Sequence, residues 1–436
     1  MKKTGTTNRK RALCAILTAA LAMGICGCGK TETMTDAGTT NGIVKEPTAG
    51  DVEAATKYDR SVEVADDFSY AGDLEAGAAY DADYTGPANA GTKDESTKKD
   101  LPEAGQLTAG VWSDNDNWGF FRNLVDSGTI SFPSFGLDPT NRTAVTVKGS
   151  DGNAVVNAKA DLLDKDGNVL WSGVTNKEGT VYLFGKDAAS VEIENDGKKQ
   201  SFEVKGGGSN DQSGKSTSSS SEMEVTLDGK GTAYKSMDIM FIVDTTGSMS
   251  DEMLFLQSEF TAITEEIGTA NTRYSVNFYR DEGDDYVTRC NDFSTDTRNI
   301  QKLLNNESAE GGGDWPEAVA EILTETMFTD DWKEDSVKLA FLIYDAPPHD
   351  GKEKELIAAA QKASERGIRL IPVVASDNDR DTELFGRALA ITTGGTYVFL
   401  TDDSGIGNSH EEPIIGSYEV RPLYNIIIDT INEYRQ

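Results

Sequence analysis

From residue 235 onward the chain alternates short apolar runs with amphipathic stretches, and this alternation restricts the possible folds more than any other feature. Within 252–268, large apolar side chains recur at steps of three and four residues, which predicts one helix with a buried stripe. Five apolar runs have the length of buried strands: residues 238–243, 274–279, 338–344, 369–375 and 396–400. Strands that alternate with helices predict an α/β fold with a doubly wound, mainly parallel sheet.

Residues 141–205 have a different pattern, in which apolar and polar side chains alternate between turn sequences rich in Asp, Asn and Gly. This pattern predicts a small β-sandwich, with 158–163 and 169–171 as paired strands. The segment resembles domains of the prealbumin or carboxypeptidase-regulatory type. The sequence Asp164-x-Asp166-Gly167 has the spacing of a calcium loop, but the downstream Glu and the flanking helices of an EF-hand are missing. We therefore interpret it as a hairpin turn.

The other parts of the first half differ from both of these domains in composition. Residues 28–104 are rich in Thr, Gly, Ala and acidic side chains, which predicts a disordered acidic tether, and Gly and Ser dominate a linker at 206–221. Residues 105–140 concentrate Trp and Phe, which predicts a segment that docks on a neighbouring surface. We favour docking within the chain, with another protein as the alternative. The α/β domain and its leading strand are assigned to 222–436.

The N-terminus has the layout of a secretory signal. A basic segment precedes a short apolar stretch at 12–25, and Cys26-Gly27-Cys28 follows. This arrangement resembles a bacterial lipobox, which implies removal of residues 1–27, lipidation of Cys28 and an extracytoplasmic protein anchored to the bacterial cell membrane. An ordinary cleaved signal with incidental cysteines is the alternative. After cleavage Cys290 would be the remaining thiol, so no internal disulfide is expected.

The charge of the chain narrows the range of possible partners. Its formal net charge is −33, and removal of the first 27 residues would make it about −38 because they carry five bases and no acids. A protein with this charge is expected to repel nucleic acid and anionic lipid. We therefore predict no nucleic-acid partner. Contact with a membrane is expected only through the lipid on Cys28.

Oxygen-bearing side chains follow the first apolar strand at alternate positions. Asp244, Thr246 and Ser248 come directly after that strand, and Asp345 directly follows another. Aspartate, threonine and serine are hard oxygen donors, which suit Mg²⁺, Mn²⁺ or Ca²⁺ rather than zinc or copper. Ligands of such folds collect at the carboxyl ends of the strands. The Gly-rich loop at 311–317 supplies further carboxylates, so three separate segments are expected to deliver oxygen ligands to one place.

Asp244-x-Thr246-x-Ser248 resembles the first loop of the metal-ion-dependent adhesion site of von Willebrand factor A domains. This family has a Rossmann-like fold and includes integrin I domains. Its members place a further ligand in a second loop and a strand-terminal Asp in a third, and this sequence has both. The Asp314-Trp315-Pro316-Glu317 loop is similar to that of integrin β subunits. The resemblance implies Glu317 as the second-loop ligand, Asp314 as its support or a ligand of an adjacent ion, and Asp345 as the third-loop ligand.

The same resemblance implies a second ion beside the first. Asp251 and Glu252 match the acidic pair that holds an adjacent Ca²⁺ in integrin β subunits, and Asp281 lies where a further acidic ligand could arise. For Asp251 and Glu252 the alternative is electrostatic, because acidic side chains are favourable at a helix N-terminus. The main site is expected to hold Mg²⁺ or Mn²⁺ and to leave one coordination position open for the carboxylate of a protein partner.

These features together predict a surface-anchored module for adhesion or assembly. It would lack enzymatic activity and capture an acidic side chain of another protein through a divalent cation. One alternative is a structural or sensory envelope lipoprotein whose α/β domain acts within a complex. A Mg²⁺-dependent phosphotransferase is a further alternative, because an Asp at the end of the first strand resembles the start of haloacid-dehalogenase-like phosphatases. It is disfavoured, because those enzymes need Asp-x-Asp and Thr246 takes the place of the second acid. The chain also has only two histidines, so acid and base catalysts are scarce.

Overall fold

The computed structural model describes residues 107–132, 135–204, 220–229, 234–313, 315–375, 378–404 and 411–435. All of them belong to one compact unit, which spans Glu75–Gln436. The predicted signal peptide, the tether with Cys28, most of the Gly/Ser linker and Asp314 lie outside the described residues. Among the helices in the described ranges, none combines the length and the apolar character needed to cross a membrane.

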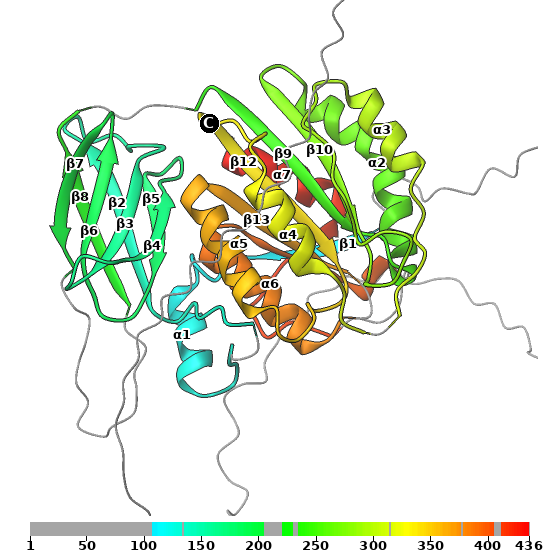
Figure 1. The fold of residues 1–436 in the computed structure, drawn as a ribbon, viewed down its shortest axis with the longest axis horizontal. Helices are drawn as coiled ribbons and strands as arrows, with labels where there is room; N and C mark the ends of the chain where they lie inside the picture. The colour runs from blue at the N-terminus through cyan, green and yellow to red at the C-terminus, as the bar shows by residue number, and fades with distance from the viewer. Residues whose placement is uncertain are drawn as a thin grey trace, which may run out of the picture. The chain divides into compact units, whose positions relative to one another are not determined.

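An eight-stranded, mostly parallel sheet forms the centre of the α/β domain (Figure 1). Its strand order is β11-β10-β9-β12-β13-β14-β1-β15, and the short β11 (Thr288–Arg289) lies at one edge. The parallel strands are β9 (Ser236–Asp244), β10 (Thr272–Tyr279), β12 (Ser336–Tyr344), β13 (Ile368–Val374) and β14 (Tyr397–Leu400). They confirm the predicted strands closely, because parallel strands that are buried on both faces consist of nearly continuous apolar residues.

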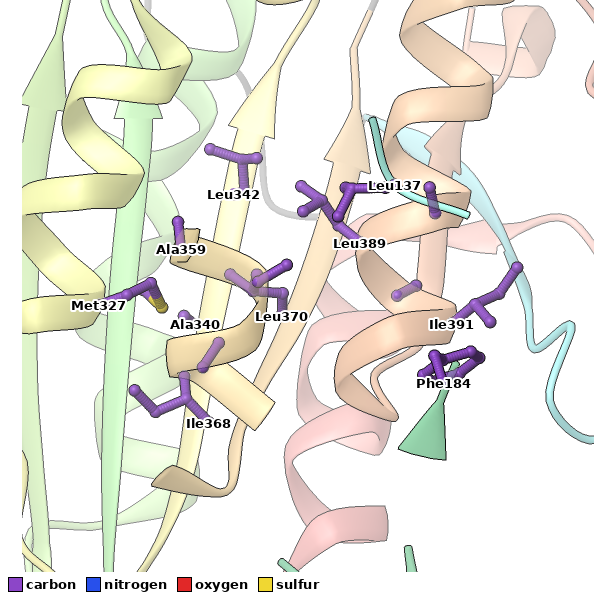
Figure 2. Close-up of a cluster of buried hydrophobic side chains, with 14 of the residues drawn as sticks. Leu137, Phe184, Met327, Ala340, Leu342, Ala359, Ile368, Leu370, Leu389 and Ile391 are labelled. Carbon is purple, nitrogen blue, oxygen red and sulfur yellow. The ribbon is translucent and has the colours of Figure 1, made fainter. Parts of the chain in front are cut away.

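Helices cover both faces of this sheet. One face carries α2 (Ser250–Ile267), α3 (Thr297–Asn305) and α7 (Leu423–Tyr434), and the other carries α4 (Val319–Phe328), α5 (Glu353–Arg366) and α6 (Arg380–Thr393). Side chains alternate between the two faces along β9: Ile239, Phe241 and Val243 join the first core, whereas Met240 and Ile242 join the second. Figure 2 shows part of the second core, where side chains of β12 and β13 meet those of α4, α5 and α6.

The sheet also contains a strand from the aromatic segment. β1 (Thr108–Trp112) pairs antiparallel with β14, from Ala109↔Leu400 to Trp112↔Tyr397, and its other side pairs with β15 (Arg421–Pro422). The chain then forms α1 (Trp118–Asp126), in which Trp118 and Phe121 are buried. The segment that we predicted to dock on a neighbour is thus part of the sheet itself, and its contacts lie within the chain.

A buried ion pair joins this segment to α6. Asp114 is 3 % exposed and Arg387 is fully buried. The guanidinium of Arg387 donates from Nε to Asp114 Oδ2 and from Nη2 to Asp114 Oδ1, both at 2.8 Å. Its Nη1 donates to Glu383 Oε1 and to the carbonyl of Ile414, both at 2.9 Å. A bidentate pair fixes orientation as well as distance, so residues 273 positions apart form one structural unit.

The chain between β1 and β9 forms two smaller sheets, ordered β5-β2-β8 and β4-β3-β6-β7. Their strands are β2 (Arg142–Gly149), β3 (Lys159–Asp164), β4 (Val169–Val174), β5 (Thr180–Phe184), β6 (Ala188–Asn195), β7 (Lys198–Glu203) and β8 (Ser221–Leu227). Val145 and Val181 of one sheet share a buried core with Leu162 and Val191 of the other. This arrangement agrees with the predicted β-sandwich, and the likeness to prealbumin-type domains stays a prediction.

Two details of the sandwich bear on the predicted boundaries. β8, which we placed at the head of the C-terminal domain, instead pairs in parallel with β2. Its side chains alternate between exposed and more buried positions, as in a sandwich strand with one solvated face. At the β3–β4 turn, Asp164 Oδ1 accepts from the backbone N–H groups of Asp166 (2.9 Å) and Asn168 (2.8 Å), and Asn168 Nδ2 donates to Asp164 Oδ2 at 2.9 Å. Both carboxylate oxygens of Asp164 thus serve the turn, in agreement with the hairpin interpretation.

Candidate functional site

The first loop of the candidate site begins at the last residue of β9. Asp244 is fully buried there, and its Oδ1 accepts from the backbone N–H of Thr246 (2.9 Å) and from Thr246 Oγ1 (2.7 Å). The Ser248 hydroxyl lies 3.4 Å from Thr246 Oγ1, in a short 3-10 helix (Gly247–Met249) that leads into α2. The turn out of β9 therefore keeps three oxygen-bearing side chains together at the C-terminal end of the strand.

Backbone hydrogen bonds attach the second loop to the first. Glu310 donates its N–H to the carbonyl of Thr245 at 3.0 Å, and Gly247 donates its N–H to the carbonyl of Gly311 at 3.2 Å. The two loops thus exchange a donor in each direction, although more than sixty residues separate them along the chain. Their relative position is consequently fixed by main-chain groups and does not depend on the side chains that carry the chemistry.

A glycine allows Glu317 to approach the first loop. Gly312 has a φ of +80°, and a Cβ added there would lie 3.2 Å from Glu317 Oε1 and 3.3 Å from Thr246 Cβ. Both the positive φ and the close approach favour glycine at this position. Glu317 and Thr246 therefore both lie close to Gly312, and the second loop brings its carboxylate near the first loop.

The third loop completes the convergence. Asp345 directly follows β12, which is the parallel neighbour of β9 with Ile343 opposite Val243. The Asp345 side chain is therefore at the same edge of the sheet as Asp244, and it is buried. The backbone N–H of Glu317 donates to the carbonyl of Pro347 at 3.0 Å, which joins the second loop to the third. The structure thus brings the five described main-site residues to one edge: Asp244, Thr246, Ser248, Glu317 and Asp345.

The carboxylates of the site are close enough to change one another's protonation. Burial raises the pKa of Asp244 to about 7, and the charge of Asp345 adds to the shift. Burial also raises the pKa of Glu317 to about 9, with further contributions from Asp244, Asp281, Asp345 and Asp284. Like charges at short range disfavour ionisation of each group. At neutral pH this edge of the sheet therefore needs protons or a bound cation to balance its negative charge.

A second set of polar groups borders Glu317. Asp281 is buried, and its Oδ1 lies 2.6 Å from Nε2 of His349, which follows the third loop. Asp284 Oδ2 accepts from the backbone N–H groups of Gly312 (2.9 Å) and Asp281 (3.2 Å). Of these residues, Asp281 was a predicted site residue, whereas Asp284 and His349 were not predicted from the sequence. The signal for Asp284 was the spacing Asp-x-x-Asp after β10, whereas nothing local linked His349 to Asp281.

Tyr286 contacts the first loop through Thr245 and restrains it. The hydroxyls of Tyr286 and Thr245 are 2.6 Å apart, and Tyr286 donates to Glu307 Oε1 at 2.8 Å. The guanidinium groups of Arg280 and Arg289 lie 4.8 Å and 3.9 Å from the centre of the Tyr286 ring. Cation–π contacts and hydrogen bonds therefore restrain the ring, and the ring restrains the residue between Asp244 and Thr246.

The donor set fits a hard divalent cation, provided that hydroxyls and water take part. No group of three or more His, Cys, Asp or Glu side chains in the described part of the chain is arranged to hold a metal ion. A coordination sphere would therefore need the hydroxyls of Thr246 and Ser248 beside the carboxylates, and Mg²⁺ accepts such a mixture. Glu317 Oε2 is buried and has no hydrogen-bond partner among the described residues, and Asp244 Oδ2 is buried near the hydroxyl of Tyr279. Unsatisfied buried acceptors of this kind are costly unless a cation or a proton satisfies them.

The remaining predicted site residues either follow the first loop, in α2, or lie outside the described residues. Asp251 and Glu252 are in the first turn of α2, where the partial positive charge of the helix N-terminus favours acidic side chains. That placement agrees with the electrostatic interpretation, and their part in a second ion site stays a prediction. Asp314 and Cys28 lie outside the described residues, so their proposed roles also stay predictions.

Residues 238–406 match the family model described as a von Willebrand factor A (VWA) domain, and the mostly parallel sheet with helices on both faces agrees with that match. The chain is 25 % identical over 211 residues to R811 of Acanthamoeba polyphaga mimivirus, described as an ariadne-like RING finger protein. That match covers 44 % of this chain and 20 % of R811, so the chain spans about a fifth of its relative's length.

Among solved structures, this chain is similar to BatB, a conserved hypothetical protein from Bacteroides thetaiotaomicron. The TM-score is 0.33 and the identity 16 %, over 45 % of this chain and 98 % of BatB.

Proposed function

We propose that this protein is a metal-dependent interaction module, in which the VWA domain captures a carboxylate of a protein partner through a divalent cation. Asp244, Thr246, Ser248, Glu317 and Asp345 would hold Mg²⁺ or Mn²⁺, and Asp314 would support Glu317 or bind an adjacent ion. The ion supplies positive charge in a chain whose formal net charge is −33, and that charge attracts the partner's carboxylate. The surrounding residues only position the ion and bind the partner, so the module acts without enzymatic chemistry.

The observation that carries this proposal is the concentration of buried carboxylates at one end of the sheet. The raised pKa values of Asp244 (about 7) and Glu317 (about 9) reflect both burial and mutual repulsion. Buried like charges are tolerated when a counter-charge balances them. A divalent cation would balance two at once, and every candidate ligand offers the hard oxygen that such an ion prefers. The location outside the carboxyl ends of the strands is also where α/β folds bind ligands.

Binding of Mn²⁺ to the full-length protein tests the proposal. We expect the wild-type protein to bind the ion in a calorimetric or EPR titration, and Asp244→Ala to weaken binding by at least about tenfold, since even residues that only support metal ligands have effects of this size. Glu334→Ala is the matched control, because that glutamate is 88 % exposed and lies in the loop before β12. Equal Mn²⁺ affinity in Asp244→Ala and the wild type would place any ion elsewhere and refute the proposal.

The two alternatives make different predictions. A phosphotransferase of the haloacid-dehalogenase-like class would need an acid two residues after Asp244, where Thr246 instead donates its hydroxyl to Asp244 Oδ1 at 2.7 Å. A structural or sensory lipoprotein that uses other surfaces would bind its partner equally well in Mg²⁺ and in EDTA. No observation favours either alternative over the metal-dependent module, and the dependence of binding on the divalent cation separates them from it.

We also propose that Cys28 carries a lipid that anchors the protein to the outer face of a bacterial cell membrane. The support is the order of basic, apolar and Cys-Gly-Cys segments at the N-terminus. Metabolic labelling with a fatty acid in a bacterial host is expected to mark the wild type and a Cys26→Ala control, but not Cys28→Ala. Label retained by Cys28→Ala would show that another residue is modified.

A further inference from the structure

An exposed tryptophan lies beside the candidate site and has no role in the proposed ion binding. Trp315 is 40 % exposed and is one of few large hydrophobic side chains that the described residues expose. It precedes Glu317 by two positions, and Glu317 is tied to the third loop through the Pro347 carbonyl. Trp315 therefore belongs to the same edge of the sheet as the carboxylates. Tryptophan is enriched among the residues that contribute most to protein interfaces.

Hydrogen bonds hold this indole in place before any partner arrives. Its Nε1 donates to Asp379 Oδ2 at 3.0 Å. The other oxygen of Asp379 accepts from the backbone N–H and the hydroxyl of Thr382, both at 2.8 Å, and so caps the start of α6. The Trp315 ring, which belongs to the second loop, is thus attached to α6, the helix that follows β13. A ring restrained in this way loses little conformational entropy on binding.

The surroundings of the ring are negatively charged. Asp379 is its hydrogen-bond partner, and burial together with the charges of Asp379 and Asp350 raises the pKa of Asp381 in the first turn of α6. Asp379 and Asp350 therefore each lie within electrostatic reach of Asp381. The base between Asp379 and Asp381 in sequence, Arg380, is engaged by Glu383 and by Glu411, the latter at 2.6 Å. A cation that approaches the indole consequently meets the carboxylate of Asp379, and further acidic side chains lie in the first turn of α6.

We propose that Trp315 stacks against a Lys or Arg side chain of the partner, so that the captured carboxylate has a basic neighbour. This inference rests on the proposed function of the site and names the partner's chemistry. The face of an indole attracts cations, more strongly than the face of Tyr or Phe, and the carboxylate of Asp379, which accepts the hydrogen bond of the indole, adds attraction of the same sign. An apolar neighbour would gain only the contact area, and an acidic one would be repelled.

A peptide library tests the inference with the full-length protein. The peptides carry one fixed Asp with randomised residues on either side, and binding is selected in Mn²⁺ and, in parallel, in EDTA. We expect the wild type to select Lys or Arg near the Asp in Mn²⁺ only. Trp315→Ala should weaken binding of the selected peptide about tenfold, equivalent to about 1.4 kcal/mol, and should leave unchanged the binding of the same peptide with Ala in place of its base.

Matched variants separate stacking from general effects. Phe328→Ala removes another exposed aromatic side chain, 46 % exposed at the far end of α4, and is expected to bind like the wild type. Selection of apolar or acidic neighbours overturns the inference, as does an equal loss in Trp315→Ala for the basic and the Ala-substituted peptide; both results leave the metal-dependent capture of Asp intact. Absence of any Mn²⁺-dependent selection of Asp peptides refutes the proposed function, and the inference with it.

Discussion

Single residues at the candidate site combine burial with negative charge. Glu317 Oε2 is buried without a hydrogen-bond partner among the described residues, Asp244 Oδ2 is buried near the Tyr279 hydroxyl, and the nearby Asp345 increases the cost of ionising both groups. Asp244 alone would be an ordinary strand-end residue, and Glu317 alone an ordinary loop residue before α4. Their placement within electrostatic reach of each other turns protonation, cation binding and stability into linked properties. The behaviour of the site should consequently depend on pH in a defined direction.

The first prediction concerns stability without divalent cations. Folding raises the pKa of Asp244 from 3.8 to about 7 and that of Glu317 from 4.5 to about 9, so the folded state holds more protons than the unfolded state between these values. The free energy of unfolding in EDTA should therefore fall as the pH rises from about 5 to about 9. Denaturant unfolding across this range measures the slope.

Two variants and one ion provide the controls for that slope. Asp244→Asn and Glu317→Gln remove the titrating groups and should each flatten it. Mg²⁺ should stabilise the wild type more at pH 9 than at pH 6, because a deprotonated site binds the ion better. A wild-type free energy of unfolding that rises with pH in EDTA would contradict the assignment of both carboxyls.

The second prediction concerns the glycine between the first and second loops. Gly312→Ala adds a Cβ at 3.2 Å from Glu317 Oε1 in a backbone with φ +80°. We expect it to weaken Mn²⁺ binding and to destabilise the protein by roughly 1 kcal/mol or more, because φ is strained for Ala and the second loop must shift. Gly152→Ala is a matched control: Gly152 has φ +79°, and nothing lies within 4 Å of its added Cβ. That control should lose stability only, with unchanged Mn²⁺ affinity in titration.

At the scale of elements, the side of the sheet that contains β14 and β15 depends on β1, which precedes both strands along the chain. β1 inserts between β14 and β15, and Asp114 just after it pairs with Arg387 inside α6. The start of α7 is also joined to this segment, since the N–H of Leu423 donates to the Leu107 carbonyl at 2.8 Å. β14, β15 and the start of α7 thus all contact the β1 segment, and the buried ion pair attaches the same segment to α6.

The third prediction is that Arg387→Met destabilises the protein by about 3–5 kcal/mol, because it leaves Asp114 buried with its charge uncompensated. Replacing both partners, Asp114→Leu with Arg387→Met, should recover part of that loss. The exposed pair Arg122–Asp126, with side chains 21 % and 46 % exposed, provides the control: Arg122→Met should change stability by less than about 1 kcal/mol. Urea unfolding of the four proteins measures these differences, and equal losses in Arg387→Met and Arg122→Met would be inconsistent with a structural role for the buried pair.

The sequence predicted elements whose signal is local and missed those whose partners are distant. β9 and β12 are continuous apolar runs, and α2 has a regular buried stripe, so each could be recognised from its own residues. β1 is five residues long and is recognisable as a strand of this sheet only through β14, nearly 300 positions away. The same limit applies to the site: Asp244 and Asp345 end apolar runs, whereas the contact of His349 with Asp281 depends on the folded loops.

At the scale of the whole molecule, the β-sandwich is an insertion between two strands of the VWA sheet, β1 and β9. Side-chain contacts join the two parts: Trp171 Nε1 donates to Ser364 Oγ at 2.9 Å, and Arg369 Nη2 donates to the Val174 carbonyl at 2.6 Å. The family match at 238–406 begins after the insertion and omits the first strand. The folding unit is therefore larger than the matched range.

The fourth prediction follows from that difference. A fragment of residues 235–436 retains the matched range but lacks β1 and Asp114, so it exposes one edge of β14 and leaves Arg387 without its carboxylate. We expect the fragment to unfold at lower denaturant concentration than a fragment of residues 105–436, with faster amide exchange in β14 and α7. Exposed strand edges also favour aggregation. Identical unfolding midpoints for the two fragments would show that β1 is dispensable.

The antiparallel direction of β1 determines where mechanical load would enter the domain. The N–H of Thr401, just past the end of β14, donates to the Thr108 carbonyl at 2.9 Å. β1 therefore begins beside the C-terminal ends of the parallel strands, which is also where Asp244 and Asp345 lie. Tension between a partner bound at Asp244 and the chain that precedes β1 would therefore be transmitted across the sheet, perpendicular to the strands, from β9 through β12, β13 and β14 to β1. At about 4.8 Å per strand this path is roughly 20 Å long. The hydrogen bonds between neighbouring strands, rather than the strands along their length, would bear the pull.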